Sequence, residues 1–252
     1  IKERVGLYAY QAVKSKWRNR FRLIVWVDNA TPFPGDDIDQ MRTIRQEVTN
    51  AADVFVVQTD AVATTLRIEG VEAARIERFN PWVDNRITRG AKSRAKAIDT
   101  LGLEESDFVV THFGQIEWEE SLFDLANALC VLQQNEPKLA AKVKLVFCGI
   151  GSFSVELRNR LVQLGLDKNA VYVAPGRGAF DTVLAAADAM FYSNSPSRDR
   201  REGEPYRLLL AMANKIPVIA SRGPLVEEIL GKHRIDFCFG SPTSLAKAVK
   251  KC

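Results

Sequence analysis

The chain has 252 residues, of which 46% are hydrophobic and 26% are charged, and this is the composition of an ordinary globular protein. The net charge of +4 is mild, and no apolar run approaches the roughly eighteen residues that a bilayer-spanning helix needs. Four cysteines lie far apart without metal-ligand spacing, and the chain has two histidines, so a zinc site or a Ser-His-Asp triad is poorly supplied.

Apolar runs of strand length alternate with segments of helical period along the whole chain. The expected strands are 23–27, 54–58, 76–79, 108–113, 143–148, 171–173, 189–192, 216–220 and 235–239. The expected helices are roughly 37–51, 61–69, 122–133, 154–164, 180–187, 206–213, 225–230 and 242–250. Alternation of this kind predicts an α/β fold with parallel sheets that are covered by helices on both faces.

A shift in composition marks a boundary between two domains. Asn80–Asp84 is typical of a turn, and the following stretch Arg86–Lys96 is polar and basic. We therefore predict a first unit over residues 1–85 and a second over 86–252. The first unit has only three expected strands, so we expect part of that domain to precede Ile1.

Strand-to-helix turns are the candidate binding elements, because ligands of open α/β sheets bind beyond the carboxyl ends of the strands. Four such turns stand out in the second unit: Phe113–Ser121, Cys148–Ser152, Ala174–Gly178 and the segment that begins at Glu202. Glycines at strand ends permit tight turns and let a phosphate approach the backbone, and helix N-termini favour anions. Each turn also has a plain alternative as an ordinary connection, and residue patterns alone do not decide between the two.

The order of several segments resembles family 4 of the retaining glycosyltransferases of the GT-B fold, and the resemblance covers about 23–250. The segments are Asp53–Thr59, Gly70–Ile76, Asn80–Asp84, Phe108–Ser121, Val143–Ser152, Ala186–Ser193 and Ala211–Ala220. The resemblance implies two Rossmann-like units, the first incomplete, with the nucleotide-sugar donor bound by the second. It implies transfer of a sugar from a UDP- or GDP-linked donor, with retention of configuration and without a metal or other cofactor.

The resemblance also assigns roles to residues. Glu202 matches a catalytic glutamate near the donor sugar, and backbone N–H groups at Glu204–Tyr206 and Gly149–Ser152 are expected near the phosphates. The full set of expected donor-binding residues is Gly114, Gln115, Gly149, Gly151, Arg177, Arg201, Glu204, Pro205, Tyr206 and Leu210. The acceptor stays open among saccharides, lipids and proteins.

Three positions depart from the family pattern. Gln115 and Glu120 stand where the family has the arginine and lysine that hold the diphosphate, and Leu210 stands where it has a ribose-binding glutamate. Glu120 would repel phosphates if it faced them. A nearby group of arginines offers compensation, or else forms a solvated loop: Arg177, Arg198, Arg200, Arg201 and Arg207. These departures keep a second reading open, a catalytically silent GT-B-like binding or scaffold protein.

Other partners follow from charge and motif content. The basic stretches Lys14–Arg22 and Arg86–Lys96 lack a ladder of interleaved aromatic residues, so we expect no nucleic-acid partner. A dinucleotide-dependent oxidoreductase is disfavoured, since no Gly-x-Gly-x-x-Gly opens a helix after a strand. We expect a cytoplasmic protein with reduced cysteines, and its mild positive charge is also compatible with peripheral attachment to a membrane surface.

Overall fold

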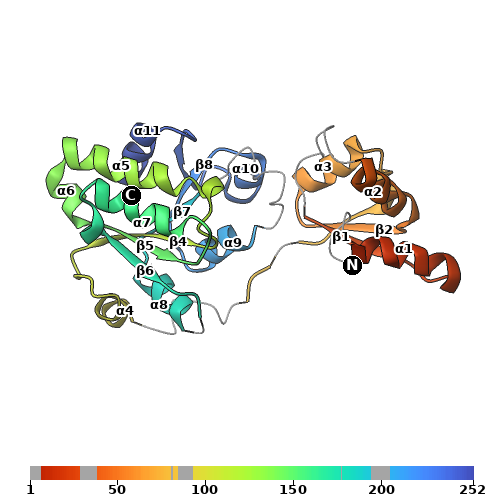
Figure 1. Ribbon diagram of the computed structural model, residues 1–252, viewed down its shortest axis with the longest axis horizontal. Helices are drawn as coiled ribbons and strands as arrows, with labels where there is room; N and C mark the ends of the chain where they lie inside the picture. The colour runs from red at the N-terminus through yellow and green to blue at the C-terminus, as the bar shows by residue number, and fades with distance from the viewer. Residues whose placement is uncertain (1–6, 29–38, 81, 85–92, 177, 194–204) are drawn as a thin grey trace. The chain divides into compact units, whose positions relative to one another are not determined.

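The computed structural model describes residues 7–28, 39–80, 82–84, 93–176, 178–193 and 205–252 (Figure 1). Within them the chain divides into two compact units: the residues up to Trp82 together with Pro205 form the first, and the remaining residues from Val83 onward form the second. Both units are built from parallel sheets and helices, which confirms the predicted α/β class. No helix in the described ranges combines the length and the apolar character that crossing a membrane requires.

The first unit contains a parallel sheet of order β1-β2-β3. Its elements are α1 Leu7–Asn19, β1 Ile24–Val27, α2 Asp39–Ala51, β2 Val54–Val57, α3 Asp60–Ile68, a short 3-10 turn Ala73–Arg75 and β3 Ile76–Arg78. Thr59 begins α3, because its hydroxyl accepts a hydrogen bond from the Val62 amide at 3.3 Å. The core of this unit is apolar, and the side chains of Phe55, Val57 and Leu66 in it are fully buried.

The second unit is a parallel six-stranded sheet of order β6-β5-β4-β7-β8-β9. Its strands are β4 Phe108–Phe113, β5 Val143–Cys148, β6 Ala170–Val173, β7 Ala189–Tyr192, β8 Val218–Ser221 and β9 Ile235–Phe237. Its helices are α4 Arg94–Thr100, α5 Leu122–Asn135, α6 Pro137–Lys142, α7 Ser154–Gln163, α8 Ala179–Ala186, α9 Tyr206–Ala213, α10 Pro224–Leu230 and α11 Pro242–Lys251, with 3-10 turns at Trp118–Glu120 and Asp167–Asn169.

Helices cover both faces of this sheet, as Figure 1 shows for α5 and α11 on one side and α4 and α8 on the other. Successive strand residues point to opposite faces, so Val109 joins the core under α4, α8, α9 and α10, and Val110 joins the core under α5, α7 and α11. The central strands are apolar on both sides for this reason. The sheet order reverses between β4 and β7, which places the switch point of the fold at the carboxyl end of β4.

Several predicted boundaries need correction. Residues 94–96, which we had placed in a basic linker, begin α4, and Ser93 caps this helix by accepting a hydrogen bond from the Lys96 amide at 3.3 Å. Pro137–Lys142 forms a helix that the periodicity did not predict. The strand expected from Ile216 starts at Val218, because the Ile216 amide donates back to the Ala211 carbonyl at 2.9 Å and completes the end of α9.

Candidate functional site

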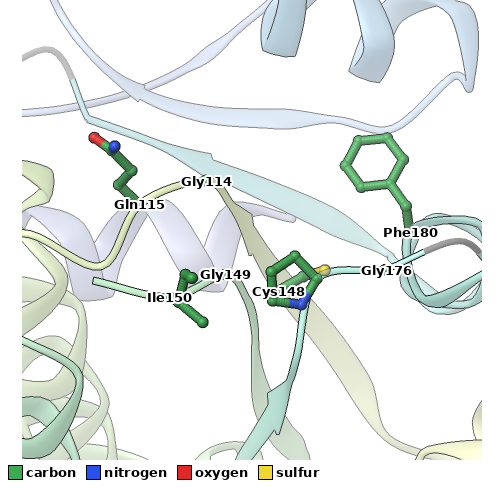
Figure 2. Close-up of a pocket in the computed structure, with 8 residues that line it drawn as sticks. Gly114, Gln115, Cys148, Gly149, Ile150, Gly176 and Phe180 are labelled. Atoms are coloured by element: carbon green, nitrogen blue, oxygen red, sulfur yellow. The ribbon is translucent and has the colours of Figure 1, made fainter.

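A pocket of about 380 Å³ opens at the carboxyl ends of β4, β5 and β6, next to the switch point (Figure 2). The turns after these strands and the first turn of α8 supply its lining: Gly114, Gln115, Cys148, Gly149, Ile150, Pro175, Gly176 and Phe180. Figure 2 shows the side chains of Gln115 and Phe180 on opposite sides of Cys148 and Gly149. The walls are largely apolar, with an amide side chain and exposed backbone at one edge.

Gly149 and Gly151 are required by the packing of two backbone turns against each other. A Cβ atom on Gly149 would lie 1.7 Å from the Gly114 carbonyl oxygen, and one on Gly151 would lie 2.1 Å from the Ile116 carbonyl oxygen. The turns continue the β4–β5 ladder, with Gly114 N donating to Cys148 O and Ile116 N to Ile150 O, both at 3.1 Å. Close backbone approach therefore explains this Gly-x-Gly pair without any ligand.

The expectation that the amides of Gly149–Ser152 bind phosphate is not supported. The Gly149 amide donates to the Val173 carbonyl at 3.2 Å, and the Gly151 amide donates to the Ser154 hydroxyl at 3.1 Å. The Ser152 amide and hydroxyl both donate to the carboxylate of Glu117, the former at 3.0 Å. An acidic side chain of the protein thus already occupies the position that an anion would take at this turn.

A buried histidine supports the turn that follows β4. His112 has no exposed surface, and its Nε2 lies 3.2 Å from the carbonyl oxygen of Gln115. Because a carbonyl oxygen only accepts, Nε2 must carry the proton of this hydrogen bond. Gly114 between them has φ +129°, a conformation that other residues rarely adopt. The conformation of the Gly114–Gln115 edge is therefore fixed before any ligand arrives.

The opposite wall is aromatic and apolar. Phe180 packs edge-to-face on Phe113, with ring centroids 4.8 Å apart, and this contact fixes the orientation of its ring beside the pocket. Cys148 lies between the two walls and is almost fully buried, and burial raises the pKa of its thiol. The thiol is therefore protonated at neutral pH and contributes apolar contact to the pocket.

Beside the pocket, Glu120 and Arg207 form a buried ion pair. The Glu120 side chain has no exposed surface, and Arg207 Nη1 lies 3.3 and 3.4 Å from its two carboxylate oxygens. The same nitrogen donates to the Phe113 carbonyl at 3.0 Å, and the guanidinium lies 4.8 Å from the centroid of the Tyr192 ring. The carboxylate of Glu120 is thus paired inside the protein, and it does not stand opposite the phosphates as its sequence position had suggested.

The structure brings some of the predicted donor-binding residues together and separates others. Gly114, Gln115 and Gly149 line the pocket, whereas Gly151 packs behind it. Leu210 is fully buried in the core under α8, α9 and α10, so it offers no surface to a ligand. Pro205 is buried and Tyr206 is 40% exposed at the start of α9. Four further predicted residues lie outside the described ones: Glu202, Arg177, Arg201 and Glu204.

The predicted site residues leave out five residues that line the pocket: Cys148, Ile150, Pro175, Gly176 and Phe180. Cys148 ends a predicted strand, and Ile150 lies between two glycines of a turn that had been chosen, so adjacency was a usable signal for both. Phe180 lies in the first turn of a helix that follows a strand, and an aromatic residue there faces the carboxyl edge of the sheet. Among the described residues, no cluster of His, Cys, Asp or Glu has the geometry to hold a metal ion.

Comparison with solved structures identifies the fold. The structure of HepE from Anabaena in complex with UDP-glucose matches with a TM-score of 0.79 at 20% identity, over 97% of this chain and 66% of HepE. WaaG, a glycosyltransferase involved in lipopolysaccharide biosynthesis, matches with a TM-score of 0.73 at 15% identity, over 96% of this chain and 72% of WaaG. The fold is therefore that of the GT-B glycosyltransferases, built from two Rossmann-like units.

Sequence comparison adds the family. A family model described as Glycosyl transferases group 1 matches residues 93–252. The D-inositol 3-phosphate glycosyltransferase of Salinispora arenicola (strain CNS-205) is 33% identical over an alignment of 168 residues, and the match covers 62% of this chain and 35% of that protein. The chain thus spans about a third of the length of this relative and 66% of HepE. It belongs to the glycosyl transferases group 1 family, which confirms the resemblance seen in the sequence.

Proposed function

We propose that this protein transfers a sugar from a UDP- or GDP-linked donor to an acceptor, with retention of configuration, and that the pocket beside Gly114 holds the nucleoside of the donor. The volume and position of the pocket are the observations that support this proposal. Its volume of about 380 Å³ lies within the roughly 300–1,000 Å³ range of small-molecule sites, and it lies at the switch point where α/β sheets bind ligands.

The chemistry of the walls suits a nucleoside. A planar base has apolar faces and polar edges, so it needs flat apolar contact and a few hydrogen-bonding groups. Phe180, Ile150 and Pro175 supply the contact, while Gln115 supplies an amide that donates and accepts. The structural neighbour HepE has been crystallised with UDP-glucose, and membership of a glycosyltransferase family supports a nucleotide-sugar donor for this chain.

The reaction places a demand on the phosphate side of the site. As the sugar leaves the diphosphate, negative charge develops on the leaving oxygen, and fixed donors must stabilise it. The Arg207 side chain, from the first turn of α9, lies beside the Gly114 edge, with its Nη1 3.1 Å from the place that a Cβ on Gly114 would take. The assignment of Glu202 to the sugar stays a prediction, since that residue lies outside the described ones.

One observation favours a binding protein without turnover as the second candidate. Leu210 is fully buried and apolar at the position where the family resemblance calls for a ribose-binding carboxylate, so α9 presents no acceptor there. Loss of a hydrogen bond to a charged carboxylate weakens a donor complex by about 1.5–3 kcal/mol. Weak binding without sugar transfer is therefore the alternative that an assay must separate.

Ligand-dependent thermal stability tests the proposal first. A ligand at a hundred times its dissociation constant stabilises the folded protein by about 2.7 kcal/mol, so UDP, GDP and their sugar derivatives should raise the melting temperature, with ATP as a control nucleotide. Substitution of Gly176 provides a matched pair, because a Cβ there meets nothing within 4 Å. We expect Gly176→Ala to keep the shift and Gly176→Leu, which adds a bulky side chain at a lining position, to lose it.

Turnover separates the two candidates. Hydrolysis of a stabilising nucleotide sugar, with water as the acceptor of the sugar, releases UDP or GDP, and a coupled assay that detects this release identifies an enzyme. Stabilisation without release at any protein concentration supports the binding protein instead. Absence of a shift with every uridine and guanosine ligand, or a shift that Gly176→Leu leaves intact, contradicts the assignment of the pocket.

A further inference from the structure

The first unit carries concentrated positive charge at the C-terminal end of α1 and in the link from α1 to β1. The stretch Leu7–Arg22 contains no acidic residue, and its basic residues are Lys14, Lys16, Arg18, Arg20 and Arg22. Salt bridges occupy the two lysines, Lys14 with Glu47 at 3.2 Å and Lys16 with Asp53. The three arginines are exposed, and within the described ranges no salt bridge reaches them.

The helix dipole explains only part of this charge. Cations in the last turn of a helix are stabilised by the C-terminal carbonyl groups, and Lys16 and Arg18 lie in that turn. The chain leaves the helix at Arg20, which has φ +50° and whose amide donates to the Lys16 carbonyl at 3.0 Å. Arg22 lies beyond this reversal, and the dipole effect fades within one turn, so the cluster is larger than the stability of α1 requires.

Exposed aromatic side chains lie among these cations. Tyr8 is 80% exposed, Trp17 66% and Phe21 38%. The Lys14 ammonium lies 4.6 Å from the centroid of the Trp17 ring, so it covers one face of the indole. Large apolar side chains that stay exposed together, with polar groups around them, are typical of an interaction surface.

The opposite side of α1 anchors this surface to the unit. Ala9 and Val13 are buried in the core of the first unit, so α1 has an apolar inner side, and its other long side faces away from the neighbouring elements (Figure 1). We call the exposed set the basic–aromatic surface, and it consists of Tyr8, Trp17, Arg18, Arg20, Phe21 and Arg22. The helix is therefore amphipathic in an unusual way, because its outer side combines arginines with aromatic rings.

We propose that the basic–aromatic surface attaches the protein to a membrane that carries anionic lipids. Tryptophan and tyrosine rings settle at the level of lipid headgroups, and clustered basic residues attract anionic headgroups. A helix with this composition lies in the plane of the membrane surface and does not cross it. The surface belongs to the first unit and does not involve the pocket, so the inference is independent of the proposed function.

Vesicle flotation tests the inference with two kinds of vesicle, one of phosphatidylcholine alone and one in which about a third of the lipid is phosphatidylglycerol. The purified protein should float with the second kind and not with the first, and its binding should weaken as the salt concentration rises. In R18Q/R20Q/R22Q the partition coefficient should fall about 100-fold, because each basic residue near an anionic surface contributes a factor of about five.

Trp17 gives a second, optical readout. Its fluorescence emission should move to shorter wavelength when anionic vesicles are added, and Trp17→Phe should lose this shift while its partition coefficient stays within about twofold of the wild type. Trp17→Ala removes the ring and should lower the partition coefficient about 3- to 10-fold.

The matched control removes the same number of exposed cations from the second unit, and it is K138Q/K247Q/K251Q. It changes the net charge by the same amount and should keep the partition coefficient within about twofold, while the melting temperature of each variant checks its folding. The inference is wrong if the wild type floats with neither vesicle, if R18Q/R20Q/R22Q binds as well as the wild type, or if the control loses as much. Binding to a single-stranded RNA without binding to either vesicle would assign the surface to nucleic acid and also overturn it.

Discussion

The substitution Gly149→Ala adds a single methyl group, but it should lower the free energy of unfolding of the second unit substantially. The added Cβ would stand 1.7 Å from the Gly114 carbonyl oxygen, and this neighbour is backbone, so it cannot rotate away. Relief requires the β4 and β5 turns to separate by roughly 1.5 Å, given ordinary contact distances of about 3.2 Å or more. That movement breaks the hydrogen bonds from Gly114 N to Cys148 O and from Ile116 N to Ile150 O.

The cost follows from these parts. Two backbone hydrogen bonds contribute about 1 kcal/mol each, and forced overpacking costs about 1–3 kcal/mol, which gives a loss of about 3–5 kcal/mol in the free energy of unfolding. Urea unfolding followed by circular dichroism measures it, with Gly176→Ala as the control because its Cβ enters open space. We expect the control to lie within about 1 kcal/mol of the wild type. A Gly149→Ala variant as stable as Gly176→Ala would refute the packing explanation of the glycine pair.

Three further outcomes are expected. Phe180→Ala removes one wall of the pocket and should weaken uridine about tenfold in calorimetry while UDP loses the same factor, because the change does not touch the phosphates. Since burial raises the pKa of the Cys148 thiol, a thiol reagent at pH 8 should label exposed Cys238 well before Cys148, as read by mass spectrometry of the peptides. A hydrogen bond from Lys16 lowers the pKa of Asp53, so the stabilisation it gives is present above about pH 4 and is lost as the pH falls through the lowered pKa. Asp53→Asn should cost about 0.5–1 kcal/mol at pH 7 in urea unfolding, and the cost should shrink as the pH is lowered.

Strand positions in the second unit were predictable because their signal is local. Phe108–Phe113, Val143–Cys148 and Ala189–Tyr192 have the predicted bounds, since each is an apolar run closed by a turn residue. Helix ends were less predictable where the chain reverses through an unusual conformation. Lys215 has φ +53°, which lets the Ile216 amide donate back to the Ala211 carbonyl. The apolar run Ile-Pro-Val that follows Lys215 gives no sequence signal for this reversal.

The candidate site was predictable only in part, and for a related reason. The turns at Gly114 and Gly149 follow from strand ends, so their residues could be named from the sequence. The ion pair of Glu120 could not be predicted, because its partner Arg207 is far along the chain and the pairing depends on how α9 packs beside β4. Adjacency in sequence suggested a carboxylate aimed at phosphate, whereas tertiary packing turned it into an internal partner.

The hydrogen bond from His112 Nε2 to the Gln115 carbonyl has a spectroscopic consequence. A ring proton that is held in this way, on a side chain without exposed surface, exchanges slowly with water and should give a resolved imidazole N–H resonance. His233, the other of the two histidines in the sequence, has no such shelter, so the resonance can be assigned from a single His112→Gln spectrum. The imidazole N–H resonance of His112 should therefore report on the pocket edge, because this N–H is hydrogen-bonded to the lining residue Gln115.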